Sequence, residues 1–209
     1  MDNQSKISKS KDAGDPNSGT WKDRRKEQLR EEFISAAAGL FRASGFDKVS
    51  VDDIVSATGV AKGTFYLYFK TKADIVQAVF EMLLDDLERH TSDALAAASS
   101  DAPVGLRAVV TVLANFLQEN PGMLAPLFDK TEDEIKNRRL AATADIYERI
   151  FRMGMLQGRY REIDPQTTSH ALLGMLAGLI HRAIDTGESF EEAGNTAVEL
   201  LERGIGRSL

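Results

Sequence analysis

The sequence predicts an all-α protein in which a small N-terminal three-helix head, containing a helix-turn-helix, precedes a larger helical body. Apolar residues recur at spacings of three and four through most of the chain, and no segment shows the alternation typical of a β-strand. Glycines and an Asn-Pro-Gly sequence end the apolar segments. We expect about nine helices in three parts: a mobile tail at 1–21, the head at 22–72 and the body at 73–209.

Composition excludes several classes of protein. The chain contains no cysteine, which excludes disulfides, thiolate metal sites and cysteine nucleophiles. The first twenty residues lack the apolar core of a secretory signal. The longest apolar run, at 171–180, is about half of what a bilayer span requires. We therefore expect a cytoplasmic protein that does not interact with membranes.

Charge is distributed unevenly along the chain. The net charge is −6, but residues 1–72 carry a balance of +3 and residues 73–209 a balance of −9. A basic N-terminal part attached to an acidic body indicates that the N-terminal part faces a polyanion. Chance variation between the two parts of an ordinary protein is the alternative explanation.

Local signals define the helices of the head. The first helix ends near Gly45, and Ser50 with Asp53 has the spacing of a capping box that starts the second helix. Gly59 ends this second helix, and a third helix begins near Ala61 and extends to about residue 69. Two short helices joined by a glycine-containing turn are typical of a helix-turn-helix.

The third helix carries five bulky apolar or aromatic residues in succession, at 65–69. Phe65 and Phe69 lie four residues apart, so both rings can pack against the first two helices. The remaining side chains then lie where a recognition helix enters the major groove, and Lys62 and Thr64 can donate to base edges there. The alternative is a three-helix unit that uses its aromatic residues only as core.

The segment from Ser50 to Ile75 reads SVDDIVSATGVAKGTFYLYFKTKADI. It resembles the DNA-binding signature of the TetR family of transcriptional regulators, and the resemblance covers residues 25–75. The features that carry it are the capping Ser50, the turn Gly59-Val60, the tetrad Gly63-Thr64-Phe65-Tyr66, the aromatic pair Tyr68-Phe69 and the run Lys70-Thr71-Lys72.

The resemblance implies an all-α homodimer whose heads bind a palindromic operator and whose bodies bind a small effector that releases the DNA. The implied contacts are with bases for Lys62, Gly63, Thr64 and Tyr68, and with phosphates for Ser50, Tyr66 and Lys72. Asp52 and Asp53 depart from the family pattern, because an acidic side chain there repels phosphate. We therefore include no side chain of the second helix other than Ser50 among the DNA contacts.

The body is expected to contain a long helix from about residue 73 to 98 and further helices at 103–120, in a short piece to residue 128, and at 131–157, 165–185 and 190–206. The helix at 165–185 is apolar nearly all round, so one face alone cannot bury it. We expect it to form a four-helix dimer interface with the helix at 190–206. The predicted interface residues are Ala171, Gly174, Ala177, Gly178, His181, Ala197 and Leu201. The alternative is a core helix of a monomer.

Aromatic and methionine side chains of the body are candidates for an effector pocket with an apolar ligand. They are Phe116, Met123, Phe128, Tyr147, Phe151, Met155 and Met175. Residues of this kind at helical spacing are also ordinary core residues, and that interpretation stays open.

Nothing in the sequence indicates catalysis. The three histidines are widely separated, and no phosphate-binding loop, HExxH or GxSxG motif is present. We expect no catalytic residue, no metal and no cofactor. The predicted function is that of a ligand-responsive transcriptional regulator, a repressor, whose partners are double-stranded operator DNA, a small-molecule effector and a second copy of the chain. The alternative is a helical small-molecule carrier or enzyme without specific DNA binding.

Overall fold

The structure, a computed structural model, describes residues 18–121 and 134–206, and in these residues it contains eight helices and no β-strand. The helices are α1 (Ser18–Ser44), α2 (Val51–Thr58), α3 (Lys62–Phe65), α4 (Lys72–Ala97), α5 (Ala102–Glu119), α7 (Glu134–Leu156), α8 (Pro165–Thr186) and α9 (Phe190–Ile205). The predicted all-α fold is confirmed. The short piece expected up to residue 128 lies outside the described residues.

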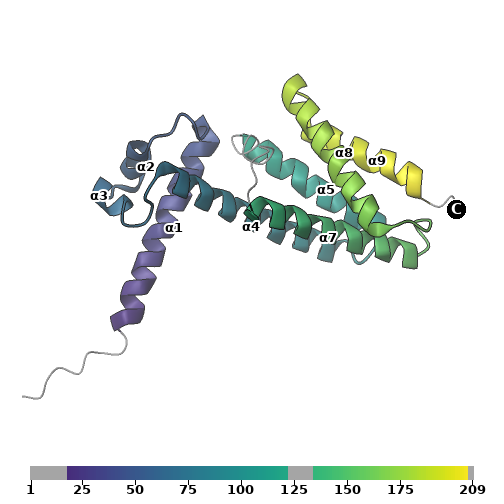
Figure 1. Cartoon of the computed structure of the whole chain (residues 1–209), viewed down its shortest axis with the longest axis horizontal. Coiled ribbons are helices and arrows are strands. Elements are labelled where there is room, and N and C mark those ends of the chain that lie inside the picture. The colour runs from purple at the N-terminus through teal and green to yellow at the C-terminus, as the bar shows by residue number, and fades with distance from the viewer. Residues whose placement is uncertain (1–17, 122–133, 207–209) are drawn as a thin grey trace, which may run out of the picture.

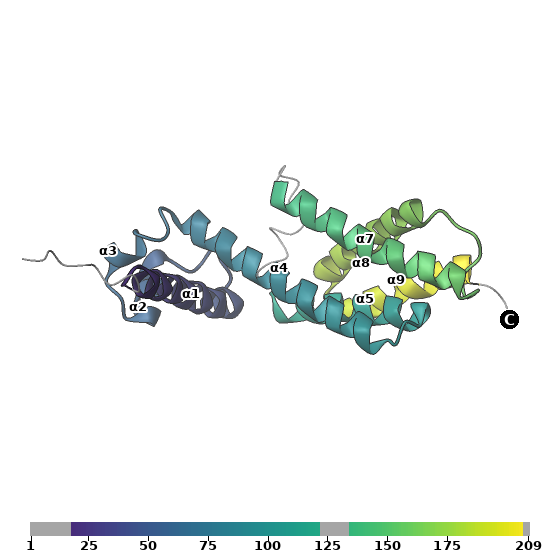
Figure 2. The same ribbon diagram turned by 90° about the horizontal axis from the view of Figure 1, so that it is seen from below.

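The helices form two units joined by α4 (Figure 1). The three helices α1 to α3 lie around the beginning of α4, whereas α5 packs against α4 in the body and α7, α8 and α9 complete the second unit. The C-terminus lies at the end of the molecule far from α3, and the view from below in Figure 2 shows the same separation.

A single hydrophobic core holds the head together. Phe33 of α1 lies at its centre, and its ring meets the ring of Phe65 edge to face at 5.5 Å. The buried members of this head core are Phe33, Ile34, Ala37, Phe41, Val49, Ile54, Phe65, Phe69, Ile75, Ala78, Val79, Phe80, Leu83 and Leu84. The first part of α4 therefore packs with the head, beyond the boundary that we predicted at residue 72.

A second core lies between α5, α7, α8 and α9 in the body. Its largest fully buried side chains include Leu106, Tyr147, Phe151 and Leu172. Helices α5 and α9 approach closely at Gly194, where an added Cβ would lie 2.7 Å from Cγ1 of Val110. A larger residue at this position would displace the side chain of Val110.

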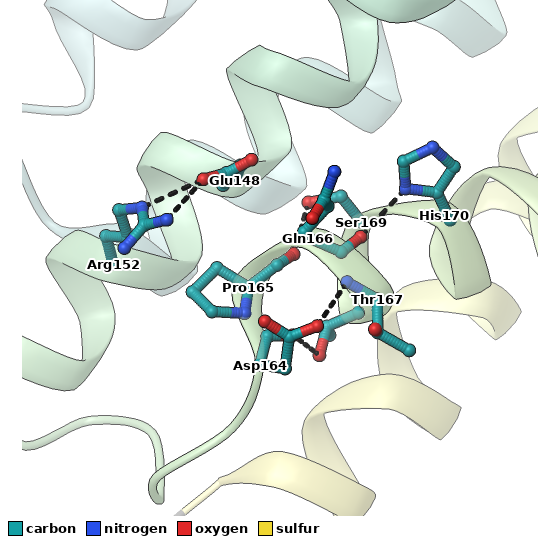
Figure 3. Close-up of polar contacts among 9 residues, drawn as sticks. Glu148, Arg152, Asp164, Pro165, Gln166, Thr167, Ser169 and His170 are labelled. Carbon is teal, nitrogen blue, oxygen red and sulfur yellow. Dashed lines mark hydrogen bonds and ion pairs between the residues drawn. The ribbon is translucent and has the colours of Figure 1, made fainter.

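Short-range hydrogen bonds start several of the helices. In the head, Ser50 and Asp53 form the predicted capping box at α2. In the body, Asp164 caps α8: its carboxylate accepts from the backbone N–H of Thr167 at 2.9 Å, and Pro165 follows it in the first turn (Figure 3). Hydrogen bonds between neighbours in the sequence thus explain where these helices begin.

A bilayer span needs about 20 mostly apolar residues. In the described part of the chain, every helix falls short of the length or the hydropathy that crossing a membrane requires.

Candidate nucleic-acid interface and body cavity

The helix-turn-helix consists of α2, a short turn and α3. Gly59 ends α2 in a left-handed conformation with φ of 67°, and its N–H donates to the carbonyl of Val55. Helix α3 is shorter than predicted, because the chain leaves the helix after Phe65 and forms a turn through Tyr68. This turn brings Phe69 back to the head core before α4 begins.

The two phenylalanines of this segment anchor it to the head. Phe65 and Phe69 are buried, and the ring of Phe33 on α1 lies edge to face with both, at 5.5 Å and 6.4 Å. The prediction that these two rings are core is confirmed. The orientation of the whole segment follows from this pair of contacts, because fixing two rings four residues apart fixes the direction of the other side chains.

The side of the segment opposite these rings faces solvent. Lys62 and Gly63 are exposed, Thr64 is partly exposed, and Tyr66 and Leu67 are 47% and 77% exposed. A Cβ added to Gly63 would meet no atom within 4 Å. No packing within the described chain therefore requires glycine at this position.

Tyr68 also contributes to the head core, although we expected only Phe65 and Phe69 of residues 65–69 to do so. Its side chain is partly buried, packs against the head core and lies 5.8 Å from the ring of Phe33. Its ring therefore supports the head, and only the part that stays accessible is available to a partner.

The ammonium of Lys62 lies 2.6 Å from a carboxylate oxygen of Asp52. The hydrogen bond to Asp52 raises the pKa of Lys62. This ion pair connects the first turn of α2 to the first residue of α3. The sequence contains no local signal for it, because the two residues meet only through the geometry of the turn.

Two of the predicted phosphate contacts lie at helix starts. Oγ of Ser50 donates to the carboxylate of Asp53 at 2.7 Å, and this hydrogen bond lowers the pKa of Asp53. Lys72 begins α4, is partly exposed, and its ammonium lies 3.4 Å from the carbonyl oxygen of Asp47. At both helix starts a capping box already bonds backbone N–H groups, with Ser50 and Asp53 at α2 and Thr71 and Asp74 at α4.

A cavity of about 790 Å³ lies in the body between α4, α5, α7 and α8. Most of its wall is apolar. The lining residues are Phe80, Leu84, Leu87, Glu88, Thr91, Ser92, Val109, Leu113, Ala142, Thr143, Asp145, Ile146, Tyr147, Glu148, Arg149, Leu173, Leu176, Ala177 and Ile180. The size is within the range of small-molecule sites.

Of the seven residues predicted to bind the ligand, Tyr147 lines this cavity. Four others, Phe116, Phe151, Met155 and Met175, belong to the body core or pack against it and do not line the cavity. Met123 and Phe128 lie outside the described residues. Residue type alone therefore did not distinguish core residues from cavity-lining residues. The sequence also did not predict that α4 contributes to the cavity wall.

Tyr147 is fully buried, and its hydroxyl has no hydrogen-bond partner among the described residues. Burial raises the pKa of this phenol. An unpaired buried donor costs free energy, and a ligand that carries an acceptor can remove this cost.

One surface of α8 presents small residues to solvent. Five of the predicted interface residues are exposed there: Ala171, Gly174, Ala177, Gly178 and His181. The prediction was wrong about the orientation of α9. Ala197 and Leu201 are buried in the body core, because α9 uses that face to pack against α5 and α8. On α9 the exposed large apolar residue is Leu200.

The described residues offer no evident metal site. Within 18–121 and 134–206, His, Cys, Asp and Glu side chains form no group of three that could hold an ion.

A helix-turn-helix with an exposed third helix, attached to a helical body that contains a cavity, is typical of transcriptional regulators that bind DNA. Residues 33–79 match the family described as "Bacterial regulatory proteins, tetR family". The HTH-type transcriptional regulator TtgR of Pseudomonas putida is 30% identical over 188 residues, which cover 81% of this chain and 86% of TtgR. The chain belongs to the TetR family of transcriptional regulators, as the sequence indicated.

Other similarities agree with this assignment. YvdT of Bacillus subtilis (strain 168), an uncharacterized HTH-type transcriptional regulator, is 43% identical over 63 residues, 30% of each chain. A TetR/AcrR-family regulator from Thermobifida fusca has the same fold, with a TM-score of 0.71, 24% identity and coverage of 86% of this chain and 100% of its own. SmeT of Stenotrophomonas maltophilia has a TM-score of 0.64, 19% identity and coverage of 86% and 91%. Family membership confirms that the chain is a regulator and not an enzyme.

Proposed function

We propose that the protein is a repressor that binds a palindromic operator as a homodimer and is released by a small apolar effector. The observation that carries this proposal is the division of residues 62–69 into two buried phenylalanine rings and an exposed opposite side. We propose repression and not activation because SmeT, which has a similar fold, is the repressor of the multidrug efflux pump SmeDEF.

In this proposal the exposed side of α3 enters the major groove. Lys62, Gly63, Thr64 and the accessible part of Tyr68 contact bases, and Ser50, Tyr66 and Lys72 contact phosphates. Selection of bound duplexes from random DNA tests specific binding, and a palindromic consensus is the expected result. Replacement of Thr64 by Val should relax preference at particular bases by ~1–3 kcal/mol, whereas Tyr66→Phe should weaken binding to all sequences. A selection without any consensus would favour the carrier or enzyme alternative.

The homodimer is proposed to form through the exposed small residues of α8. Small side chains let two helices approach closely, and the two copies of α8 and α9 would form a four-helix interface. Such a dimer separates its heads to match half-sites about 34–36 Å apart. Sedimentation equilibrium at micromolar concentration tests the dimer, and a monomer would contradict it.

Helix α4 provides the connection between effector and DNA in this proposal. Phe80 and Leu84 belong to the head core and also line the body cavity. A ligand in the cavity that displaces these side chains also changes the packing of the head core. The ligand therefore binds more tightly to one arrangement of the two heads than to another. That difference in affinity is what allosteric release requires.

The effector part of the proposal is tested in two steps. A thermal-shift screen of lipophilic compounds identifies ligands of the body. Each ligand is then titrated against the complex of protein and operator, and the expected result is weaker operator binding. If compounds that occupy the cavity leave operator affinity unchanged, the ligand-release proposal is wrong, although the DNA-binding proposal would stand.

A further inference from the structure

Asp52 is not among the predicted DNA contacts, because a carboxylate near DNA repels phosphate. In the structure its side chain is 68% exposed, that of Lys62 is 51% exposed, and the two form the ion pair of 2.6 Å. The neighbouring acid has a different role: the carboxylate of Asp53 accepts from both the backbone N–H and Oγ of Ser50 in the capping box. Asp52 is thus the acid of the first turn of α2 that contacts α3.

We propose that Asp52 is a specificity-determining residue, which holds the ammonium of Lys62 so that it contacts a base edge and not a phosphate. This inference rests on the proposed function, in which the exposed side of α3 meets DNA. It adds a role for an acidic residue that weakens DNA binding in general and improves discrimination between sequences.

The chemistry of lysine makes such a restraint effective. A lysine ammonium is a compact charge on a flexible chain, and without a partner it can reach any nearby phosphate. Contacts of that kind supply the sequence-independent part of DNA binding. The carboxylate of Asp52 neutralises this charge in the free protein and fixes its position on α3.

The ammonium has three hydrogens, so it can keep its hydrogen bond to Asp52 and donate to a second acceptor. Guanine presents O6 and N7 as acceptors at one place in the major groove. If the correct base lies at that place, both contacts coexist. If Lys62 turns to a phosphate, the ion pair breaks and the carboxylate of Asp52 is left unpaired beside a polyanion.

The experiment compares four proteins: wild type, Asp52→Asn, Lys62→Met and the double variant. Two duplexes are used, the operator recovered by selection and a scrambled duplex of equal length and composition. For Asp52→Asn we expect affinity for the scrambled duplex to rise by about 1.5- to fivefold per head, the range that one exposed ion pair can supply. Affinity for the operator should rise less, so that the ratio of the two affinities falls.

Salt dependence gives a second readout that a purely structural role would not change. A new phosphate contact by the released Lys62 of each head should make the slope of log affinity against log salt steeper by about 0.9 per head, or about 1.8 for the proposed dimer, on the scrambled duplex. Asp93→Asn is the matched control, because this exposed acid lies in the second half of α4, away from the head. It should leave the slope and the affinity ratio unchanged.

Two results would overturn the inference. One is an equal gain in affinity for both duplexes, which is the effect of charge alone. The other is the same effect of Asp52→Asn in the Lys62→Met background, since the proposed restraint acts through Lys62. Asp52→Ser, which keeps a residue suited to a helix start, repeats the measurement if Asp52→Asn lowers the melting temperature. A wild-type protein that enriches no sequence would instead show that the proposed function has failed.

Discussion

Arg42 donates from Nη2 to Oδ1 of Asn120 across 3.4 Å, and this hydrogen bond joins the last turn of α1 to the residue that ends α5. Asn120 is buried, and its amide also donates to the carbonyl of Phe116 at 2.8 Å. The side chain of Phe116 packs against both the head core and the body core. Head and body are therefore connected at a second place besides α4.

Replacement of Arg42 by Met should weaken the effect of the effector on operator binding. This hydrogen bond is part-buried, and its loss leaves Oδ1 of the buried Asn120 without its donor, which costs about 1–3 kcal/mol of stability. A change of this size leaves most of the protein folded, while the head loses one of its connections to the body. The measurement is the ratio of operator affinities with and without a saturating ligand, which should move toward one. Arg203→Met is the control, because Arg203 pairs with Glu199 within α9. A ratio equal to that of wild type would contradict the role of this contact.

The carboxylates at the helix starts predict a loss of stability in acid. Hydrogen bonds from Ser50, Thr71 and Thr167 lower the pKa of Asp53, Asp74 and Asp164, respectively. A lowered pKa in the folded state means that the stabilisation is present above the ordinary carboxyl pKa and is lost as pH falls through the lowered value. Thermal unfolding followed by circular dichroism between about pH 6 and pH 2 should show this decline.

Asp164→Asn tests one of these carboxylates, because asparagine also caps helices but does not titrate. The variant should lose less stability than wild type over the acid range. Asp185→Asn, in the last turns of α8, is the control and should follow wild type. Equal acid sensitivity of wild type and Asp164→Asn would contradict the assignment.

Replacement of Tyr147 by Phe should leave the stability of the body unchanged or raise it by up to ~1–2 kcal/mol, because it removes a buried hydroxyl that lacks a partner among the described residues. The same variant should be less sensitive to alkali. Burial raises the pKa of Tyr147, so its stabilisation is present below the ordinary phenol pKa of about 10 and is lost as pH rises above it.

Urea denaturation of both proteins near pH 8 and near pH 10.5 measures the effect of Tyr147→Phe. Tyr66→Phe is the control, because Tyr66 is largely exposed. Burial also raises the pKa of Tyr160, so a smaller alkaline loss should persist in the variant. A clear loss of stability at neutral pH would show that the hydroxyl of Tyr147 makes a contact that the described residues do not include.

Gly178 gives a test of the dimer that separates assembly from folding. A Cβ at this position meets no atom within 4 Å in the chain itself, so Gly178→Ala should stabilise the isolated helix by ~0.5–1 kcal/mol. Gly178→Phe should block a second copy of α8 and shift the protein toward monomer in sedimentation equilibrium. Gly39→Phe, also at an open position but on α1, should not do so. A dimer that tolerates Gly178→Phe would place the interface elsewhere.

The parts of the fold that the sequence predicted depend on short-range interactions. The eight described helices lie at expected places, because residues such as Ser50, Asp164 and Gly59 start or end helices through hydrogen bonds to near neighbours. The boundaries differ in two places. Helix α1 begins at Ser18, before any apolar periodicity, and α3 ends at Phe65, because the turn that follows is needed to bury Phe69.

The parts that the sequence did not predict depend on contacts between distant segments. The apolar residues of α9 lie mostly on one face, but the sequence does not say which partner covers it; packing of this face against α5 and α8 buries Ala197 and leaves Leu200, at the edge of the face, exposed. The pair of Asp52 and Lys62 likewise exists only after the turn brings α2 and α3 together. Composition cannot separate cavity wall from core, which is why the sequence grouped Phe151, a residue of the body core, with Tyr147, which lines the cavity.

Phe80 and Leu84 belong to the head core and also line the body cavity, and this restricts which substitutions they can tolerate. If the cavity binds the effector, as proposed, a substitution at either residue alters ligand fit and, at the same time, the packing of the head core. Adaptation to a new chemical signal is therefore expected to use wall positions on α7 and α8 that the head does not share, such as Ile146 and Leu173. Under the proposed function, ligand specificity can then change among descendants of this chain while the recognised operator stays the same.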